Sequence, residues 1–352
     1  MTDSKTIRWG IAGAGAIATQ FARDIQYAAG ATLAAVTARD PAKALAFARQ
    51  HGMAAEFGSL PAMISSGLVD AVYIATPNNV HCAQTLACIA ARMPVLVEKP
   101  LTASLAQARQ IETAARAAGS FVMEAMWSRY LPAVQTARAA IRDGAIGTVT
   151  RLEAELAWKI DYDPHSRFFD KTNGGGALYD LGVYPISLAR FLLGEPTLIT
   201  GTWRPAPSGV DIAAEISMHF GETEALIRCG FDRTGENRMI IEGDRGVMSL
   251  GVPFIKAEAY TVFASRRRAD FAEPGGEALA ARIRRKLFRH IPLPGTQRRD
   301  FTFPGSGLQF EIEAASDAIR QNWNEHPDNL LGDSIATLRI IEEVLATPPL
   351  VA

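Results

Sequence analysis

A lysine at the end of an apolar run is the first group in this chain whose type and position indicate chemistry. Three apolar residues, Val95-Leu96-Val97, lead directly into Glu98-Lys99-Pro100. A buried parallel strand has this composition, and ligands bind at the carboxyl ends of the strands in an open α/β sheet. The run therefore predicts that Lys99 acts on a bound ligand. A solvated lysine at a strand end is the open alternative.

An aspartate and a tyrosine form a second candidate group. Asp180 and Tyr184 follow Gly174-Gly175-Gly176 and are four residues apart, so a helix from these glycines to about Leu193 places both on one face. A tyrosine hydroxyl has an ordinary pKa of about 10, and a nearby ammonium group lowers it enough for proton transfer. The spacing alone is equally compatible with a surface aspartate and a half-buried tyrosine.

A glycine-rich turn near the N-terminus predicts a dinucleotide site. The pattern G-x-G-x-x-A lies between an apolar strand, Ile7 to Ala12, and a helical pattern that begins at Ala16. The first glycine allows a tight turn, the second lets the backbone approach a pyrophosphate, and the alanine permits close helix–strand packing. A plain glycine-rich turn is the alternative. The expected contacts are Gly13, Gly15, Ala16, Ile17 and Ala18.

The end of the second strand favours NADP, with NAD as the less favoured cofactor. An NAD site usually has an acidic residue there, whereas this chain has Arg39 followed by Asp40 and Pro41. Arg39 is suited to pair with a 2′-phosphate and to stack on adenine. Asp40 lies one position late, directly before a proline, where it is suited to cap the next helix.

The overall composition bears on the class of function. The 352 residues carry a net charge of −1, so no global field attracts nucleic acid or an anionic membrane. No apolar run approaches the ~20 residues of a membrane span. The polar N-terminus leads directly into a strand, which predicts no secretory leader. Three cysteines without metal-type spacing, and histidines that share none, predict a cytoplasmic protein with no metal site.

The elements that must position these residues change character near residue 125. Strand and helix patterns alternate up to that point, which predicts a doubly wound parallel sheet at residues 1–125. Residues 126–352 contain consecutive segments of period-2 alternation, which predict an α+β domain with a large, mostly antiparallel open sheet. Its second face is suited to hold another subunit in a homodimer. A helical pattern at 309–321 and 332–346 closes the chain, and its last helix is expected to pack back on the first domain.

Four motifs together resemble the Gfo/Idh/MocA oxidoreductases over nearly the whole chain. They are Gly13 to Ala18, Ala75-Thr76-Pro77-Asn78 with His81, Glu98-Lys99-Pro100, and Gly174 to Tyr184. Most members of this family have histidine where this chain has Tyr184. The sequence Asp-Leu-Gly-Val-Tyr is similar to a branch of the family that includes dihydrodiol dehydrogenases and NADP-dependent D-xylose dehydrogenases.

The resemblance implies a Rossmann domain, a C-terminal domain on an open sheet, and a cis peptide between Lys99 and Pro100. It also implies hydride transfer between a nicotinamide and a CH–OH or C=O group of a sugar, polyol or cyclic trans-diol. We assign Tyr184 as the acid/base, Lys99 as its electrostatic partner and Asp180 as the group that orients them.

The same resemblance extends the candidate site beyond these three residues. Further contacts to the nucleotide are expected from Thr76, Pro77, Asn78, His81, Glu98 and Lys99. For His81, a role in capping a helix is equally open. The expected substrate pocket contains Trp127, Arg129, Tyr162 and Phe168. Aromatic side chains are more often core residues, which is the alternative for this last group.

Residues 264–300 do not fit the family pattern, because they are longer and more basic than a hairpin. They contain ten basic and four acidic residues, and Leu279, Ile283 and Leu287 have helical spacing among the arginines. A solvated lid or subunit arm is the favoured interpretation, and contact with an anionic surface is the alternative. Two alternatives stay open: an oxidoreductase with a non-dissociating nucleotide and, from another class of function, a non-catalytic NADP-responsive binding protein.

Overall fold

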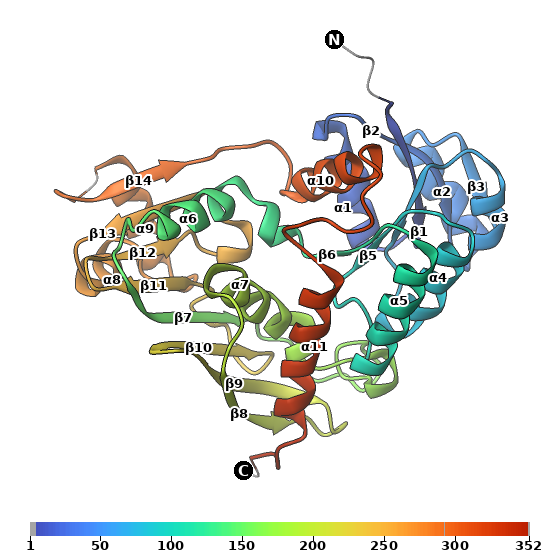
Figure 1. Ribbon diagram of the computed structural model, residues 1–352. Coiled ribbons are helices and arrows are strands. Elements are labelled where there is room, and N and C mark those ends of the chain that lie inside the picture. The colour runs from blue at the N-terminus through green and yellow to red at the C-terminus, as the bar shows by residue number, and fades with distance from the viewer. Residues whose placement is uncertain (1–4, 292, 351–352) are drawn as a thin grey trace. The chain divides into compact units, whose positions relative to one another are not determined.

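The computed structural model describes residues 5–291 and 293–350, and these residues form two compact units (Figure 1). The first unit extends to Tyr130 and includes Pro304–Leu338. The second comprises Leu131–Phe303 and begins again at Arg339. The division expected from the sequence lay between residues 125 and 126, with the last helix packed back on the first domain. As a statement about domains it stays a prediction.

The first unit is built on a six-stranded parallel sheet with the strand order β3-β2-β1-β4-β5-β6. The strands are β1 (Ile7–Ala12), β2 (Ala31–Thr37), β3 (Ala55–Phe57), β4 (Ala71–Ile74), β5 (Val95–Glu98) and β6 (Val122–Ala125). The expected parallel sheet is therefore confirmed. The strand order reverses between β1 and β4, and ligands bind outside the carboxyl ends of the strands at such a point.

Five helices connect these strands: α1 (Ala16–Asp24), α2 (Pro41–His51), α3 (Leu60–Ser65), α4 (Asn78–Ala90) and α5 (Leu105–Ala118). A further helix, α10 (Leu308–Arg320), comes from the returning segment, Pro304–Leu338. The regular part of α1 ends at Asp24, and the chain continues as a 3₁₀ turn at Ile25–Tyr27. In the core Phe21 stacks on Tyr73, with ring centroids 3.9 Å apart.

The returning segment is held to the first unit by buried polar contacts. Helix α10 packs on α1, beside which it lies in Figure 1. The indole nitrogen of Trp9 donates to the hydroxyl of Ser316 at 3.0 Å. The buried carboxylate of Asp24 accepts hydrogen bonds from the backbone of Ser306 (2.9 Å) and Leu308 (3.1 Å) and from the Ser306 hydroxyl. These contacts place α10 in the first unit, and the packing of the last helix on that unit stays a prediction.

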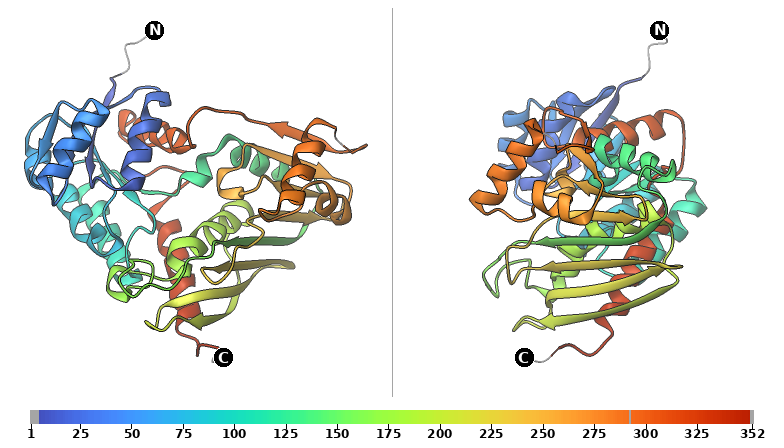
Figure 2. Two further views of the ribbon diagram at one scale, coloured as in Figure 1. Left: turned by 180° about the vertical axis from the view of Figure 1, so that it is seen from behind. Right: turned by 90° about the vertical axis from the view of Figure 1, so that its left-hand side faces the viewer.

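The second unit is built on an eight-stranded sheet with the order β14-β13-β12-β11-β7-β10-β9-β8, whose strands lie side by side in the right-hand view of Figure 2. Its strands are β7 (Val149–Ala157), β8 (Leu198–Pro205), β9 (Asp211–Phe220), β10 (Thr223–Gly230), β11 (Met239–Gly243), β12 (Gly246–Leu250), β13 (Ala259–Phe263) and β14 (Gln297–Asp300). Among the described strands of this second sheet only the pair β7–β10 is parallel, so the mostly antiparallel sheet is confirmed.

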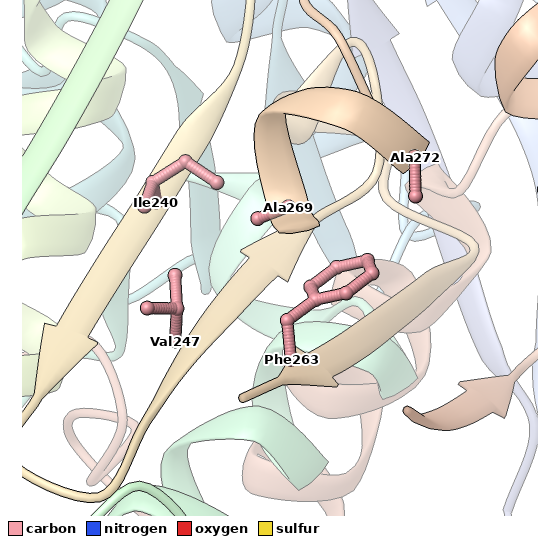
Figure 3. Close-up of a cluster of buried hydrophobic side chains, with 5 residues drawn as sticks. All are labelled: Ile240, Val247, Phe263, Ala269 and Ala272. Carbon is pink, nitrogen blue, oxygen red and sulfur yellow. The ribbon is translucent and has the colours of Figure 1, made fainter. Parts of the chain in front are cut away.

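Different helices cover the two faces of this sheet. The helices of the unit are α6 (Pro132–Arg142), α7 (Val183–Leu193), α8 (Arg266–Ala272) and α9 (Leu279–His290), and α11 (Leu331–Leu345) enters it at Arg339. Helix α7 packs on β7 and β10. On the other face α8 covers β11 to β13 through a small cluster of Ile240, Val247, Phe263, Ala269 and Ala272 (Figure 3).

The uncovered part of that second face is charged. Arg228 of β10 pairs with Glu215 of β9 at 2.7 Å, and Arg151 pairs with Glu153 on β7 at 2.8 Å. Arg266 of α8 then reaches Glu153 at 2.8 Å. Because side chains alternate between faces, these positions are the polar half of the period-2 pattern. The surface is less apolar than the sequence pattern indicated, and a dimer through it stays a prediction.

Four elements were not expected from the sequence: β3, β13, β14 and α8. The strand β14 reads Gln297-Arg298-Arg299-Asp300 and has no apolar side at all. It forms because its backbone pairs with β13, which is a tertiary interaction. No helix among the described residues is long and apolar enough to cross a membrane.

A buried carboxylate also fixes the helix that carries Asp180 and Tyr184. A π-helical turn, Leu178–Gly182, precedes α7, so the helix expected from the glycines to Leu193 is not regular at its start. The carboxylate of Asp211 accepts from the backbone of Leu178 at 2.6 Å. Asp211 is 1% exposed, and this burial raises the pKa of its carboxyl group to about 6.

We expect Asp24→Ala to lower the free energy of unfolding by about 1–3 kcal/mol, because buried backbone donors of Ser306 and Leu308 lose their acceptor. Asp317→Ala on α10 is the matched control, since Asp317 is exposed and its ion pair with Arg320 contributes little. Urea unfolding of both variants measures the difference. Equal losses would contradict the anchoring role of Asp24.

We expect Asp211 to make the free energy of unfolding decrease between about pH 4 and pH 6. Its folded pKa of about 6 exceeds the ordinary 3.8, so the folded state holds the proton more tightly in this interval. Stability is thus lost as pH rises through the interval and is level above it, by about 3 kcal/mol in all. Asp211→Asn removes this slope, whereas Asp161→Asn, at an exposed carboxyl group, leaves it unchanged. Urea unfolding across pH measures it, and identical slopes would refute the assignment.

Candidate active site

The glycine-rich turn has the backbone that a dinucleotide cradle requires. Gly13 has φ +114°, a conformation that favours glycine, and a Cβ atom there would collide with the carbonyl oxygen of Ala75. Gly15 is the N-cap of α1, and the space where its Cβ would stand is open to 4 Å. The backbone is therefore free to approach a phosphate at the N-terminus of α1.

A cavity of about 410 Å³ lies at this turn, entirely within the first unit. It is lined by several residues expected at the nucleotide: Gly13, Gly15, Arg39, Thr76 and Pro77. Of the other expected contacts, Ala16, Ile17 and Ala18 lie in the first turn of α1, and Asn78 begins α4. The segments after three separate strands, β1, β2 and β4, thus meet at one cavity.

One end of this cavity is cationic. The side chain of Arg39 is exposed there, and Asp40 caps α2 by accepting from the backbone of Ala42 at 2.9 Å and of Lys43 at 3.4 Å. The expectation that Asp40 caps the next helix is confirmed. Lys43 and Ser59 also line the cavity, and sequence reasoning missed both. The signal for Lys43 was its place in the first turn of the helix that follows Arg39 and Asp40.

His81 is a buried bridge between two strand-end loops. Its side chain is 0% exposed, with Nε2 at 2.8 Å from the carbonyl oxygen of Thr76 and Nδ1 at 3.0 Å from that of Pro100. Burial lowers the pKa of its imidazole. These contacts tie the loop after β4 to the turn after β5. They make His81 a positioning residue, and its direct contact with the nucleotide stays a prediction.

The residues around Lys99 combine a buried acid with a partly exposed lysine. The peptide between Lys99 and Pro100 is cis, as the resemblance implied. Glu98 is buried, accepts a hydrogen bond from the hydroxyl of Tyr73 and another from the backbone of Lys99 at 3.1 Å. Burial raises the pKa of Glu98 to about 7.

Two further buried carboxyl groups lie in the same unit, and sequence reasoning missed them. Glu124 of β6 accepts from the backbone of Leu101 and from the hydroxyl of Ser334, both at 2.7 Å. Glu311 of α10 is 0% exposed, and its oxygens have no hydrogen-bond partner among the residues that the structure describes. Burial raises the pKa of both groups. For Glu311 the signal was its place on the apolar stripe of Leu308 and Ile312.

The expected substrate residues of the first unit are buried. Trp127 is 6% exposed and Arg129 is 1% exposed. The guanidinium of Arg129 donates to the carbonyl oxygen of Asp328 at 2.9 Å and pairs with Asp333 at 3.1 Å. Arg129 therefore helps to hold the returning segment. Contact of these two residues with a substrate stays a prediction.

In the second unit, Asp180 and Tyr184 lie at the start of the helix anchored by Asp211. Asp180 is within the π turn and faces Arg167, whose Nη2 lies 3.7 Å from its carboxylate. Tyr184 is 8% exposed in the first turn of α7. Gly175 packs so tightly on the carbonyl groups of Arg167 and Phe168 that a side chain would not fit, which confirms the expected close approach.

The aromatic residues expected in the substrate pocket belong to the loop before this helix. Tyr162 is 41% exposed and meets the buried ring of Phe169 edge-on, with centroids 5.0 Å apart. Phe168 lies edge-on to Phe231 at 5.5 Å, and the guanidinium of Arg167 lies over its ring at 4.2 Å. Within residues 5–291 and 293–350 there is no cluster of three or more His, Cys, Asp or Glu suited to a metal ion.

Comparisons with known proteins identify both parts of the chain. Residues 7–126 match the model of the oxidoreductase family GFO_IDH_MocA, with an NAD-binding Rossmann fold. Residues 134–249 match the GFO/IDH/MocA C-terminal domain. The trans-1,2-dihydrobenzene-1,2-diol dehydrogenase of Sus scrofa is 27% identical over 344 residues, and that of Homo sapiens is 28% identical over 345. Each alignment covers 96% of both chains.

Solved structures show the same fold. An aldose-aldose oxidoreductase from Caulobacter crescentus, complexed with glycerol, has a TM-score of 0.81 and 22% identity, covering 97% of this chain and 96% of that one. KijD10, a 3-ketoreductase from Actinomadura kijaniata in complex with NADP and TDP-benzene, has a TM-score of 0.78 and 21% identity, covering 97% of both chains. Together the two family models match most of the chain, which belongs to the Gfo/Idh/MocA oxidoreductases and is an NAD(P)-dependent dehydrogenase or reductase.

Proposed function

We propose that this enzyme uses NADP to transfer hydride between the nicotinamide and a CH–OH or C=O group of a sugar, polyol or cyclic trans-diol. The cationic end of the cavity carries the proposal for NADP. Arg39 and Lys43 both line it, while the nearby carboxylate of Asp40 is engaged in capping α2. A 2′-phosphate would meet two cations there, and Asp40, the one acidic residue among the described residues that line the cavity, already accepts two backbone hydrogen bonds at Oδ1.

The remaining nucleotide contacts follow from the cavity and the turns around it. The backbone at Gly13, Gly15 and Ala16 would hold the pyrophosphate at the N-terminus of α1, with Ile17 and Ala18 beneath it. Thr76 and Pro77 line the other side of the cavity, and Asn78 begins α4 beside them. Glu98 ends β5 and Lys99 follows it, and we expect both to lie near the nicotinamide. His81 supports these residues by joining the two loops.

The proposed chemistry needs a group that moves one proton. When bound, the nicotinamide supplies or accepts the hydride. In the oxidative direction the Tyr184 hydroxyl, as phenolate, takes the proton of the substrate hydroxyl; in reduction it returns a proton to the carbonyl oxygen. The ammonium group of Lys99 favours the phenolate and stabilises negative charge on the substrate oxygen. Asp180 orients Lys99 or a second substrate hydroxyl.

The substrate class is proposed from the relatives and from the residues expected around the substrate. The curated relatives act on a trans-dihydrodiol by name, and a solved structure of similar fold is an aldose-aldose oxidoreductase. All these substrates share vicinal hydroxyl groups on a ring or chain. Tyr162 and Phe168 would supply aromatic surface against which such a molecule packs, with Trp127 and Arg129 on the first unit.

We expect Arg39→Ala to reduce the ratio of NADP to NAD efficiency about 10- to 100-fold, because a charged hydrogen bond is worth roughly 1.5–3 kcal/mol. Lys43→Ala should reduce the same ratio by a smaller factor. Arg49→Ala, an exposed arginine on α2 that does not line the cavity, is the control. The measurement is kcat/KM with each cofactor. An unchanged ratio in Arg39→Ala would refute the assignment of NADP to this end.

A panel of aldoses, inositols and trans-dihydrodiols with NADP tests the substrate class. On the best substrate we expect Tyr184→Phe to lower kcat about 10²- to 10⁴-fold, because the proton acceptor is lost. Binding of NADPH, followed by its fluorescence, should be unchanged. Tyr179→Phe removes the same hydroxyl from a buried tyrosine in the π turn and should leave kcat nearly intact. Near-normal turnover by Tyr184→Phe would remove Tyr184 from this role, and tight NADPH binding without any turnover would favour a sensor.

A further inference from the structure

Helix α9 presents an apolar stripe to solvent. Leu279, Ile283, Leu287 and Ile291 recur every fourth residue and are 71%, 59%, 48% and 64% exposed. The opposite side of the helix is attached to the protein, because Phe288 packs against the cluster beneath α8 that Figure 3 shows. A helix that is held by the protein on one side and exposes apolar side chains on the other indicates an interaction site.

The same helix is strongly basic. Between Leu279 and His290 it contains Arg282, Arg284, Arg285, Lys286 and Arg289, and no acidic residue. Within the part of the chain that the structure describes, Arg282, Arg284 and Lys286 form no ion pair. Arg285 instead donates to the carbonyl oxygens of Pro274 and Gly276, at 2.7 and 2.8 Å. These cations border the apolar stripe.

A second observation on the flank of α9 points to anionic groups. A cavity of about 640 Å³ is lined by Arg285, Lys286, Arg289 and His290 of α9. Lys256 and Arg298 line it from the rest of the second unit, where Arg298 is paired with Glu273 at 2.8 Å. The remaining charged lining residue is Glu258, so the hollow keeps an excess of positive charge. Phosphate groups would complement that excess.

Charge and shape distinguish between three candidate partners for this surface: a second copy of the chain, a single-stranded nucleic acid and a lipid bilayer. A second copy of the chain would bring two segments of residues 264–300 together, each with a net charge of +6, and like charges repel. A single-stranded nucleic acid stacks its bases on aromatic side chains, whereas this stripe is aliphatic. A bilayer with anionic lipids offers an apolar interior for the stripe and phosphates for the cations.

We propose that α9 docks flat on an anionic phospholipid surface. Leu279, Ile283, Leu287 and Ile291 enter the boundary between headgroups and acyl chains. Arg282, Arg284 and Lys286 lie at the level of the lipid phosphates, and the basic cavity holds further headgroups. The surface lies outside every residue assigned to the nucleotide or the substrate, so the proposal is independent of the proposed function.

Vesicle binding of the full-length protein with NADP bound tests the proposal. We expect at least about tenfold stronger binding to vesicles of phosphatidylcholine with phosphatidylglycerol than to phosphatidylcholine alone, weakening as NaCl is raised. The double variant Ile283→Ser, Leu287→Ser should lose this binding, and Lys286→Glu should weaken it severalfold. NADPH affinity should stay the same in all variants.

Matched controls lie on the same unit. Leu198→Ser changes a leucine that is 54% exposed on β8, and Arg142→Glu reverses an exposed charge on α6. Neither should alter vesicle binding. The proposal fails if the folded protein ignores anionic vesicles, or if the control variants weaken binding as much as those in α9. It also fails if Ile283 and Leu287 are needed for self-association or RNA binding in place of vesicle binding.

Discussion

Buried hydrogen bonds at the carboxyl ends of β4 and β5 hold the backbone on which the rest of the candidate site depends. His81 joins the carbonyl groups of Thr76 and Pro100, and Glu98 takes the hydroxyl of Tyr73. A buried polar group without a partner costs about 1–3 kcal/mol, so these contacts select one arrangement of the two loops. Glu124 extends the same network to the returning segment through Ser334. The turn that carries Lys99 is thus supported from residues more than 200 positions away.

Two different electrostatic environments lie along the nucleotide-binding edge of the first unit. Around Arg39 and Lys43 the surface is solvated and cationic, which suits recognition of a charged phosphate. Around Glu98 and Glu311 the carboxyl groups are buried, and this burial raises their pKa values. The proposed chemistry belongs beside this second environment, because desolvation strengthens the effect of each charge.

The two faces of the sheet in the second unit carry different structural features. One face carries α7, whose preceding π turn is fixed by the buried carboxylate of Asp211. The opposite face is partly covered by α8 and is otherwise a lattice of ion pairs such as Arg228 with Glu215. Helix α9 extends from this side with its apolar residues outward. The helix with the proposed acid/base, a charged sheet surface and a basic amphipathic helix are therefore built on the same eight strands.

Local patterns in the sequence determined the alternating strands and helices of the first unit, the period-2 strands of the second, the nucleotide turn and the helix of residues 279–290. These features depend on neighbours within a few residues, through hydrophobic periodicity and glycine conformation. Only the tertiary structure decided that Glu124 and Glu311 are buried, that Arg129 binds the returning segment, and that Gln297–Asp300 is a strand. It also decided that Arg39 and Lys43 line one cavity together with the turn at Gly13 and the loop at Thr76. Such outcomes depend on partners remote in sequence, because burial and backbone pairing are properties of the packed chain.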